Sequence, residues 1–183
     1  MLLNLSIDHH SDFHKWISNK LAVKYSLSSF QPLRNMDWTR QYLERILADP
    51  SSWNQVISVG ECKVGYCGLS NISIHNKNAE FFILIGDMEF WNKGIGTKAG
   101  ILVLNHAFKV LSLNRVWLTV SACNDGAIHS YEKIGFLKEG IMREACYRDE
   151  HYHDKLVMGI LSKEWHDNTD HLLDKNEPHK KNF

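Results

Sequence analysis

The sequence predicts an α+β fold in which a mixed, mostly antiparallel sheet carries helices on both faces. Three short apolar segments follow one another between residues 55 and 86 with turn residues between them, which indicates a meander of strands. From Ile95 to Leu111, apolar residues recur at spacings of three and four, which is typical of an amphipathic helix. Strand-like segments return after this helix, so strands of one sheet lie on either side of it in the chain.

Two helices are expected upstream of the first strand. Asp8 or Ser11 is placed to cap the first, because a short polar side chain accepts a hydrogen bond from the first helical turn. Pro32 separates the two helices, since the residue before a proline disfavours helical geometry. Asn35 or Asp37 is then expected to cap the second helix.

The meander is expected to consist of strands at 55–60, 64–74 and 79–86. Two polar segments, 61–63 and 75–78, supply the turns that connect them. Tight turns of this length join antiparallel neighbours, so these three strands are expected to pair in chain order.

Downstream of the central helix, residues 115–121 read as a buried strand and 126–134 as a short helix. A final hairpin is expected from strands at 136–148 and 152–161. We expect residues 1–165 to form a single domain. The last segment, 166–183, is rich in Asp, Asn, His and Lys and is expected to be a flexible tail.

The overall composition is that of an ordinary globular protein. The 183 residues include 21 basic and 21 acidic side chains, so the formal net charge is zero and no electrostatic footprint for nucleic acid or an anionic membrane is present. The first residues lack the basic and apolar regions of a secretory signal, and no apolar run reaches membrane-spanning length. Four cysteines form no disulfide-like framework, which favours a cytoplasmic location.

The turn before the central helix has the features of a phosphate-binding loop. Gly94 and Gly96 allow close approach to the backbone, and the helix that follows directs unpaired N–H groups at the turn. The segment fits the spacing of a dinucleotide fingerprint, but 115–121 contains no acidic residue to bind a ribose. A Walker loop is also excluded, because Thr97 and Lys98 follow Gly96 in the wrong order.

A second motif lies at the end of the strand at 115–121. Residues 124–136 read N-x-x-A-x-x-x-Y-x-x-x-G-F, and with the glycine turn they resemble the GNAT superfamily of acetyl-CoA-dependent N-acetyltransferases. The aromatic-rich segment 89–96 resembles the branch that acetylates ribosomal-protein N-termini. In the superfamily, Gln or Arg usually occupies the position of Trp91, and that branch commonly carries Trp there.

This resemblance implies an acyltransferase that uses acetyl-CoA as co-substrate and needs no metal. It places the cofactor along the strand that precedes the glycine turn, in the turn itself and at the start of the helix at 126–134. The residues that it assigns to cofactor binding are Phe82, Ile83, Leu84, Ile85, Trp91, Asn92, Lys93, Gly94, Ile95, Gly96, Thr97, Lys98, Asn124 and Ala127.

Two side chains are candidates for proton transfer. Tyr131 follows Ala127 by one helical turn, and its neutral phenol can protonate a departing thiolate. Glu80 is the candidate base, because strand alternation places it on the face of Phe82 and Leu84. A solvated carboxylate on the strand and a packed tyrosine are the structural alternatives for these two residues.

The acceptor remains open at the level of sequence. The resemblance places it near the two upstream helices, so Trp38 and Tyr25 are candidate substrate-binding residues, alongside Trp16 and Phe30. Simple packing of these aromatic residues onto the sheet is the alternative. Glu144 is expected to attract a cationic acceptor. A protein N-terminal α-amine is favoured over a small amine, polyamine or amino-sugar nucleotide, and a monomer or homodimer is expected.

Other interpretations compete with these. A non-catalytic acyl-CoA sensor on the same fold would bind acetyl-CoA without turnover. Cys123 is expected to be a buried structural thiol, because no motif pairs it with a histidine. His151 and His153 with Asp154 are expected to be polar surface rather than metal ligands, and His75 to be a turn residue rather than an acceptor-site base.

Overall fold

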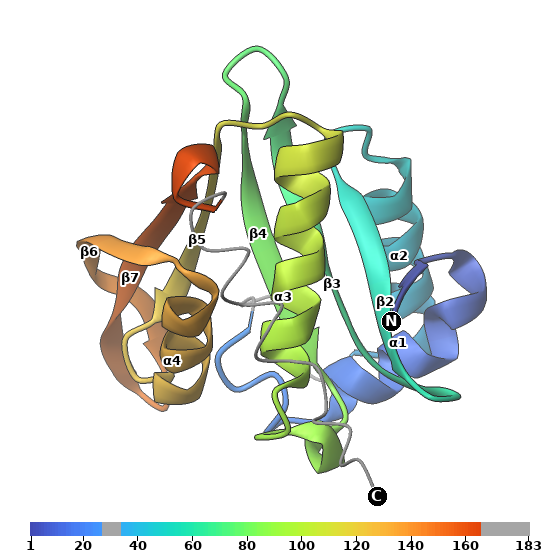
Figure 1. Cartoon of the computed structure of the whole chain (residues 1–183). Coiled ribbons are helices and arrows are strands. Elements are labelled where there is room, and N and C mark those ends of the chain that lie inside the picture. Colours follow the sequence, from blue (N-terminus) through green and yellow to red (C-terminus); the bar gives the residue numbers. More distant parts are fainter. Residues whose placement is uncertain (27–33, 166–183) are drawn as a thin grey trace, which may run out of the picture.

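In a computed structural model of the chain, residues 1–26 and 34–165 are described. Their centre is a seven-stranded sheet of order β1-β2-β3-β4-β5-β7-β6, shown in Figure 1. Neighbouring strands are antiparallel except β4 and β5, which are parallel, so the mixed, mostly antiparallel sheet is confirmed. The strands are β1 (Leu2–Asn4), β2 (Trp53–Val59), β3 (Cys62–Ser73), β4 (Asn78–Ile85), β5 (Arg115–Ser121), β6 (Leu137–Arg148) and β7 (His151–Leu161).

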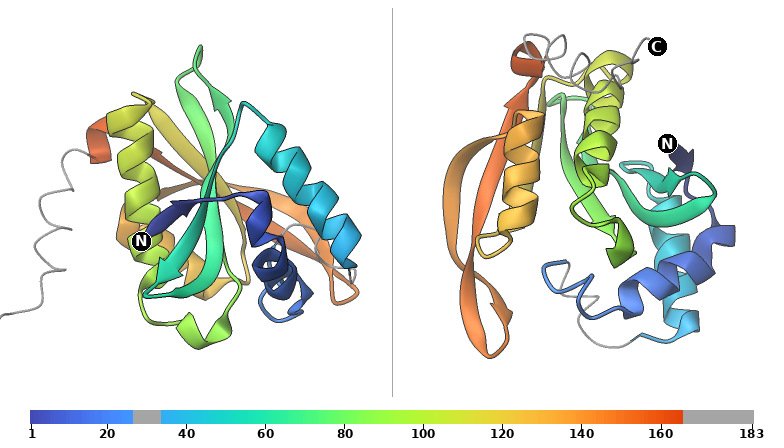
Figure 2. Two further views of the ribbon diagram at one scale, coloured as in Figure 1. Left: turned by 90° about the vertical axis from the view of Figure 1, so that its right-hand side faces the viewer. Right: turned by 60° about the horizontal axis from the view of Figure 1, so that its bottom comes forward.

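Helices cover both faces of this sheet, as Figure 2 shows. They are η1 (Ile7–His9), α1 (His10–Ser18), α2 (Met36–Ala48), η3 (Met88–Phe90), α3 (Ile95–Asn105), the π-helical turn η4 (His106–Val110) and α4 (Asp125–Ile134). Leu43 of α2 and Phe13 of α1 belong to a buried cluster with Leu84 of β4. The second and larger cluster joins Phe81 of β4 to Leu104 of α3, so successive β4 residues face opposite helix layers.

The expected meander β2–β3–β4 is confirmed, and so are the two upstream helices and the final hairpin. The short strand β1 was not expected, because three residues are too few to show a period. It pairs with β2 and thereby extends the sheet by one strand. The predicted break near Pro32 and the predicted tail 166–183 lie outside the described residues.

Only one of the two predicted helix caps is correct. The Asn35 side chain accepts a hydrogen bond from the Trp38 backbone N–H at 2.8 Å and starts α2 as expected. Neither Asp8 nor Ser11 starts the first helix, because a 3₁₀ turn that follows Ser6 precedes it. The Ser6 backbone N–H is bonded to the His9 ring at 3.0 Å, so the helical segment begins several residues earlier than a simple Asp or Ser cap predicts.

Close packing of α3 on α4 depends on a glycine. A Cβ atom on Gly100 would lie 2.5 Å from the Ile134 Cδ1 atom, well inside contact distance. The absence of a side chain therefore lets the two helices approach, and both pack over Phe81. This contact fixes the position of α4 relative to the start of α3.

Candidate active site

The parallel strands β4 and β5 diverge at the centre of the sheet. Their pairing covers Asn78 to Glu80 and ends there. In the described part of the chain, 81–85 pair with β3 alone, while the rest of β5 pairs with β7. Figure 1 shows the two strands separating toward the start of α3. Backbone groups of β4 that point into this opening are free to bind a ligand, and crevices at the carboxyl ends of parallel strands are common ligand sites.

The start of α3 forms one rim of the opening. Gly94 caps this helix with a φ of +72°, a left-handed conformation that favours glycine. Gly96 is different, because an added Cβ would meet its nearest neighbours, Ile83 and Ser130, at an ordinary 3.9 Å. Neither strain nor packing in the free protein requires glycine there. A phosphate bound close to the backbone N–H groups of this helix start is the role that the sequence predicts for Gly96.

The loop from β4 to α3 is held by the unusual residue Trp91. Its indole N–H donates to the carbonyl oxygen of Ile85 at 2.9 Å, which closes the loop onto the end of β4. Asn92 adopts a left-handed φ of 58°, and the Lys93 ammonium lies 5.4 Å from the centre of the Phe90 ring. Trp91 thus has a structural role at the position where the superfamily pattern has Gln or Arg.

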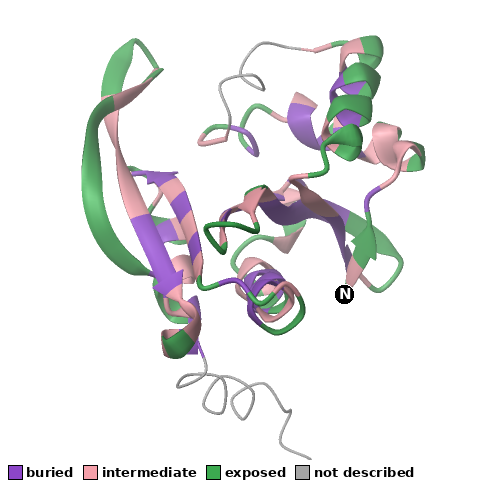
Figure 3. Cartoon of the chain, turned by 90° about the horizontal axis from the view of Figure 1, so that it is seen from above, coloured by how far each residue is buried: buried purple, intermediate pink, exposed green. Residues whose placement is uncertain are grey.

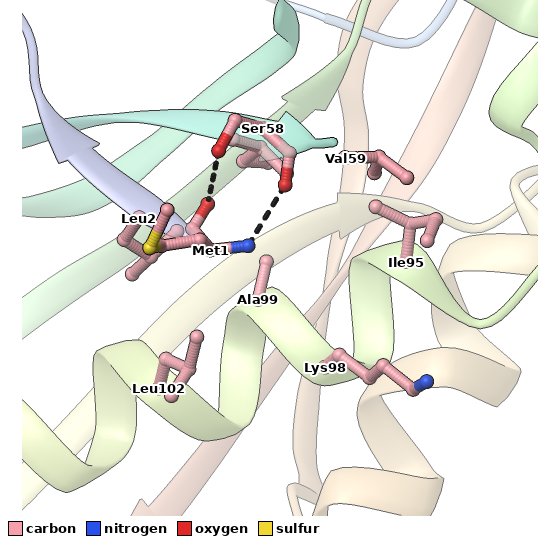
Figure 4. Close-up of a pocket in the computed structure, with 9 residues that line it drawn as sticks. Met1, Leu2, Ser58, Val59, Ile95, Lys98, Ala99 and Leu102 are labelled. Atoms are coloured by element: carbon pink, nitrogen blue, oxygen red, sulfur yellow. Dashed lines mark hydrogen bonds between the residues drawn. The ribbon is translucent and has the colours of Figure 1, made fainter. Parts of the chain in front are cut away.

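Three of the residues predicted to bind the cofactor have other neighbours within the protein. The Thr97 hydroxyl is hydrogen-bonded to the Ser130 hydroxyl at 2.8 Å, which ties α3 to α4. Ile95 and Lys98 line a small cavity of about 40 Å³ with Met1 and Leu2 of the amino terminus, as Figure 4 shows. Cofactor contacts of these three residues remain a prediction.

Tyr131 lies at the narrow end of the opening. Its ring packs edge-on against Phe81, the first β4 residue beyond the paired segment, with ring centres 5.9 Å apart. Phe136 packs against it at the same separation. Burial raises the pKa of Tyr131, and its hydroxyl makes no hydrogen bond with any described residue. The phenol is therefore neutral and available to donate a proton.

Glu80 lies on the opposite face of the sheet from Tyr131. Phe82, its neighbour on the same face, packs in the cluster with α1 and α2, as the alternation predicts. One carboxylate oxygen of Glu80 accepts a hydrogen bond from the Asn71 side chain at 2.9 Å. The other oxygen has no partner in the described ranges, so it can accept a proton or hold a water.

Asn124 and Ala127 form the start of α4. The Asn124 side chain accepts a hydrogen bond from the Ala127 backbone N–H at 3.3 Å, so it caps this helix. Cap formation explains an Asn at this position by itself. Its contact with the cofactor remains a prediction.

The predicted acceptor residues occupy different surroundings. Trp16 is 1% exposed, and a Cβ on Gly86 would lie 2.2 Å from its side chain, so the interpretation of Trp16 as a pocket residue is wrong. Its ring is needed to fill the core beneath β4. Trp38 is half-buried and stacks on Tyr42 at 5.2 Å. Tyr25 is half-buried beside the Lys24 ammonium, and Phe30 lies outside the described residues.

Glu144 lies on the β6–β7 hairpin, as the predicted strand at 136–148 implies. With Arg143 and Asp154 it lines a cavity of about 560 Å³. The Glu144 backbone N–H donates to the Asp154 carboxylate at 2.8 Å, and a φ of 51° marks the bulge that interrupts strand pairing there. Figure 3 shows the exposed hairpin facing α1 and α2 across the end of the sheet.

Arg148 connects the hairpin to the segment that follows α1. Its guanidinium donates hydrogen bonds to the backbone carbonyl oxygens of Lys24 and Ser26, the second at 2.6 Å. Tyr25 lies between these two acceptors. Sequence reasoning missed Arg148, because a backbone acceptor more than a hundred residues away leaves no local pattern. It also missed Asn71, whose contact with Glu80 depends on how β3 and β4 pair.

Comparison with known proteins identifies this arrangement. Residues 1–137, which contain the glycine turn and the whole of the second motif, match the family model described as an acetyltransferase (GNAT) domain. The chain belongs to the GNAT acetyltransferases. As a member of this family it is an N-acetyltransferase that uses acetyl-CoA, and the expectations for fold, reaction and co-substrate are confirmed.

Several GNAT relatives resemble the chain closely enough to align. YdaF of Bacillus subtilis, whose name gives it provisionally as a ribosomal N-acetyltransferase, is 33% identical over 129 residues, which span 70% of this chain and 67% of YdaF. Spermidine N(1)-acetyltransferase of Escherichia coli K12 is 30% identical over 122 residues, or 67% of this chain and 65% of that protein. The Vibrio cholerae enzyme of the same name is 30% identical over 153 residues, covering 83% and 87%.

A solved structure shares the fold. Spermidine N-acetyltransferase from Vibrio cholerae, in complex with CoA and spermine, superposes with a TM-score of 0.81 at 24% identity and covers 90% of this chain and 96% of that one. Within the residues that the structure describes, no cluster of His, Cys, Asp or Glu has the arrangement of a metal site. Their helices also include none long and apolar enough to cross a membrane.

Proposed function

We propose that this GNAT enzyme acetylates a primary amine of a small polycation of the spermidine class. The observation that carries the proposal is the open hollow of about 560 Å³ on the hairpin, where the carboxylates of Glu144 and Asp154 outnumber the one guanidinium, that of Arg143. Two carboxylates can hold the distal ammonium groups of a polyamine while one amine reaches the sheet opening. Relatives named spermidine acetyltransferases support this choice.

Proton transfer is assigned to two side chains on opposite faces of the sheet. Glu80 removes a proton from the acceptor ammonium, directly or through a water, on the face of α1 and α2. Tyr131 donates a proton to the departing sulfur from the face of α3 and α4. Glu80 is the last β4 residue that pairs with β5, so a reaction centre in the opening just beyond it would have the acceptor and the leaving group on opposite sides of the sheet.

Acetyl-CoA supplies the activated acetyl group, and backbone groups of this chain would hold it. The backbone N–H groups at the start of α3 can bind its pyrophosphate. Gly96 has no Cβ atom, so a phosphate can come close to the backbone there. The segment 82–85 of β4 fits the pantetheine arm, and its N–H groups can stabilise negative charge on the acetyl oxygen. Asn124 would contribute from the start of α4.

The test measures release of free CoA thiol with spermidine, spermine and butylamine at equal concentrations. Polyamines are expected to give kcat/KM at least tenfold above that of butylamine, because only they carry further ammonium groups. Glu144→Gln should raise the polyamine KM several-fold. The matched control is Glu61→Gln in the β2–β3 turn, another exposed carboxylate outside the cavity. Equal kcat/KM for butylamine and spermidine would contradict the proposal.

A protein N-terminal α-amine is the second candidate, and the relationship to YdaF favours it. An α-ammonium has an ordinary pKa of about 8, compared with about 10.4 for an alkyl ammonium, so it demands less from a base. Peptides with a free amino terminus, assayed beside spermidine, distinguish the two. A blocked amino terminus on the same peptide is the control for acetylation of lysine.

A further inference from the structure

The turn between β5 and α4 carries a thiol that the acetyltransferase reaction does not use. Cys123 is exposed, and its Sγ atom lies 3.6 Å from the Nδ1 atom of His153. The sequence expectation of a buried structural thiol without a histidine partner is therefore wrong. Pairing of β5 with β7 brings the two residues together, since Ser121 aligns with Lys155 and the Ala122 N–H bonds to the Asp154 carbonyl.

The contact made by Nε2, the second ring nitrogen of His153, determines whether Nδ1 carries a hydrogen in the neutral ring. Nε2 lies 3.2 Å from the backbone carbonyl oxygen of Arg148. A carbonyl oxygen only accepts hydrogen bonds, so Nε2 carries the hydrogen in the neutral ring. Nδ1 then has a free lone pair that faces the thiol of Cys123. A nucleophile, a base and a group that orients the base are the parts of an activated thiol.

His153 is held in this orientation by the hairpin. Its Cα aligns with that of Cys146 across the β6–β7 pair, and the Cys146 thiol donates to its carbonyl oxygen at 3.5 Å. Arg148, whose carbonyl orients the ring, is itself anchored to the backbone of Lys24 and Ser26. The base is therefore fixed by the strand pairing and by the contact with the segment after α1.

The other three thiols lack this arrangement. Cys67 is fully buried, and burial raises its pKa, which makes its thiolate scarce. Cys146 directs its thiol at a carbonyl oxygen. Cys62 is exposed at the start of β3 and has no imidazole bonded to it among the described residues. Cys62 is thus an internal control with similar exposure and no base.

We propose that Cys123 is a site of reversible thiol modification that reacts with the disulfides of small thiols, such as CoA disulfide or glutathione disulfide. His153 Nδ1 takes the S–H proton, and the Cys123 sulfur attacks one sulfur of the disulfide. A new S–S bond forms as the old one breaks, and the second thiol leaves with the proton. The Cys123 sulfur is oxidised and the released small thiol is the reduced product, so atoms and electrons balance.

The test follows adduct formation in the free protein with glutathione disulfide at pH 7, by intact mass and peptide mapping. Cys123 is expected to react at least ~10-fold faster than Cys62 in the same molecule. His153→Gln and His153→Asn should reduce the Cys123 rate to that of Cys62 and leave the Cys62 rate unchanged. Equal rates in the unmodified sequence, or an undiminished Cys123 rate in both folded variants, would overturn the proposal. Acetyl transfer plays no part in this readout.

The position of the thiol gives the modification a consequence that rests on the proposed active site. Cys123 precedes Asn124, the cap of the helix that carries Tyr131, so an adduct lies at the wide end of the opening between β4 and β5. The isolated mixed disulfide with CoA is expected to lose at least ~10-fold in kcat/KM for acetyl-CoA and to regain it on reduction. Cys123→Ser treated in the same way should stay active. Full activity of the modified protein would contradict this consequence.

Discussion

At the scale of single residues, Tyr131 has a half-buried ring and a hydroxyl that forms no hydrogen bond with any described residue. Contacts with Phe81 and Phe136 fix the ring, and the loss of the hydroxyl alone would leave those contacts intact. Replacement of Tyr131 by phenylalanine therefore tests the hydroxyl alone, because the ring is kept and the proton donor is removed. The proton-accepting role of Glu80 can be separated from its orientation in a similar way. The hydrogen bond from Asn71 can be removed by mutation of Asn71 while the Glu80 carboxylate is kept.

Tyr131→Phe is expected to lower kcat roughly 100-fold, because a positioned general acid contributes about that factor or more. Acetyl-CoA affinity should remain nearly unchanged. Burial raises the Tyr131 pKa above its ordinary value of about 10, so the acid form persists to higher pH than in a free phenol. The kcat profile should consequently show no alkaline loss from this group below pH ~9. Steady-state kinetics across pH measure both effects, and unchanged kcat would remove Tyr131 from the reaction.

Glu80→Gln is expected to lower kcat by roughly 100-fold at neutral pH, since an amide cannot accept the ammonium proton. Asn71→Ala is the matched variant, because it keeps the carboxylate and removes the hydrogen bond that orients it. Its effect should be several-fold at most. If both variants reduce kcat equally, Glu80 acts through its contact with Asn71 rather than as a base.

At the scale of elements, the start of α3 combines a helix terminus with a glycine that packing does not require. Glycine within a helix is about 1 kcal/mol less favourable than alanine. A Cβ at Gly96 fits against Ile83 and Ser130 without displacement. The packing of the free protein therefore does not require glycine at this position, which agrees with the proposed approach of a ligand to the backbone there.

Gly96→Ala is expected to raise the stability of the free protein, by up to ~1 kcal/mol, while weakening acetyl-CoA binding. Gly96→Asp should weaken binding tenfold or more, because it adds a negative charge beside the pyrophosphate. Thermal melts and binding titrations measure the two quantities on the same samples. Unchanged affinity in a folded Gly96→Asp protein would falsify the phosphate cradle.

At the scale of the whole molecule, the proposed acceptor side consists of two parts that are distant in sequence. The helices α1 and α2 form one wall and the β6–β7 hairpin forms the other, with Arg148 bonded between them. The proposed cofactor side consists of β4, α3 and α4, which are closer together in the chain. Acceptor binding should therefore depend on the contact between the walls, and cofactor binding should not.

Arg148→Ala is expected to raise the acceptor KM several-fold and to leave the acetyl-CoA KM nearly unchanged, since it releases the hairpin from the segment after α1. Arg40→Ala, which removes an exposed arginine paired with Glu44 within α2, is the control. Equal changes in both constants would show that the two halves of the site are not separable.

Much of the secondary structure and the motifs of the candidate site could be predicted from the local sequence. The meander, the central helix and the final hairpin follow from hydrophobic period and turn residues. The glycine turn and the motif at 124–136 were recognisable because cofactor binding uses backbone and residues at short, fixed spacing. Strand alternation alone predicted that Glu80 and Phe81 lie on opposite faces of the sheet.

The tertiary structure decided what depends on contacts between distant segments. The divergence of β4 from β5 after Glu80 has no signal in either strand, because each still pairs fully on its other side. Trp16 proved to be core because Gly86 leaves room for its ring, a fit that neither segment reveals by itself. Cys123 and His153 meet because β5 pairs with β7, and a side chain's chemistry follows from the neighbour that the fold supplies.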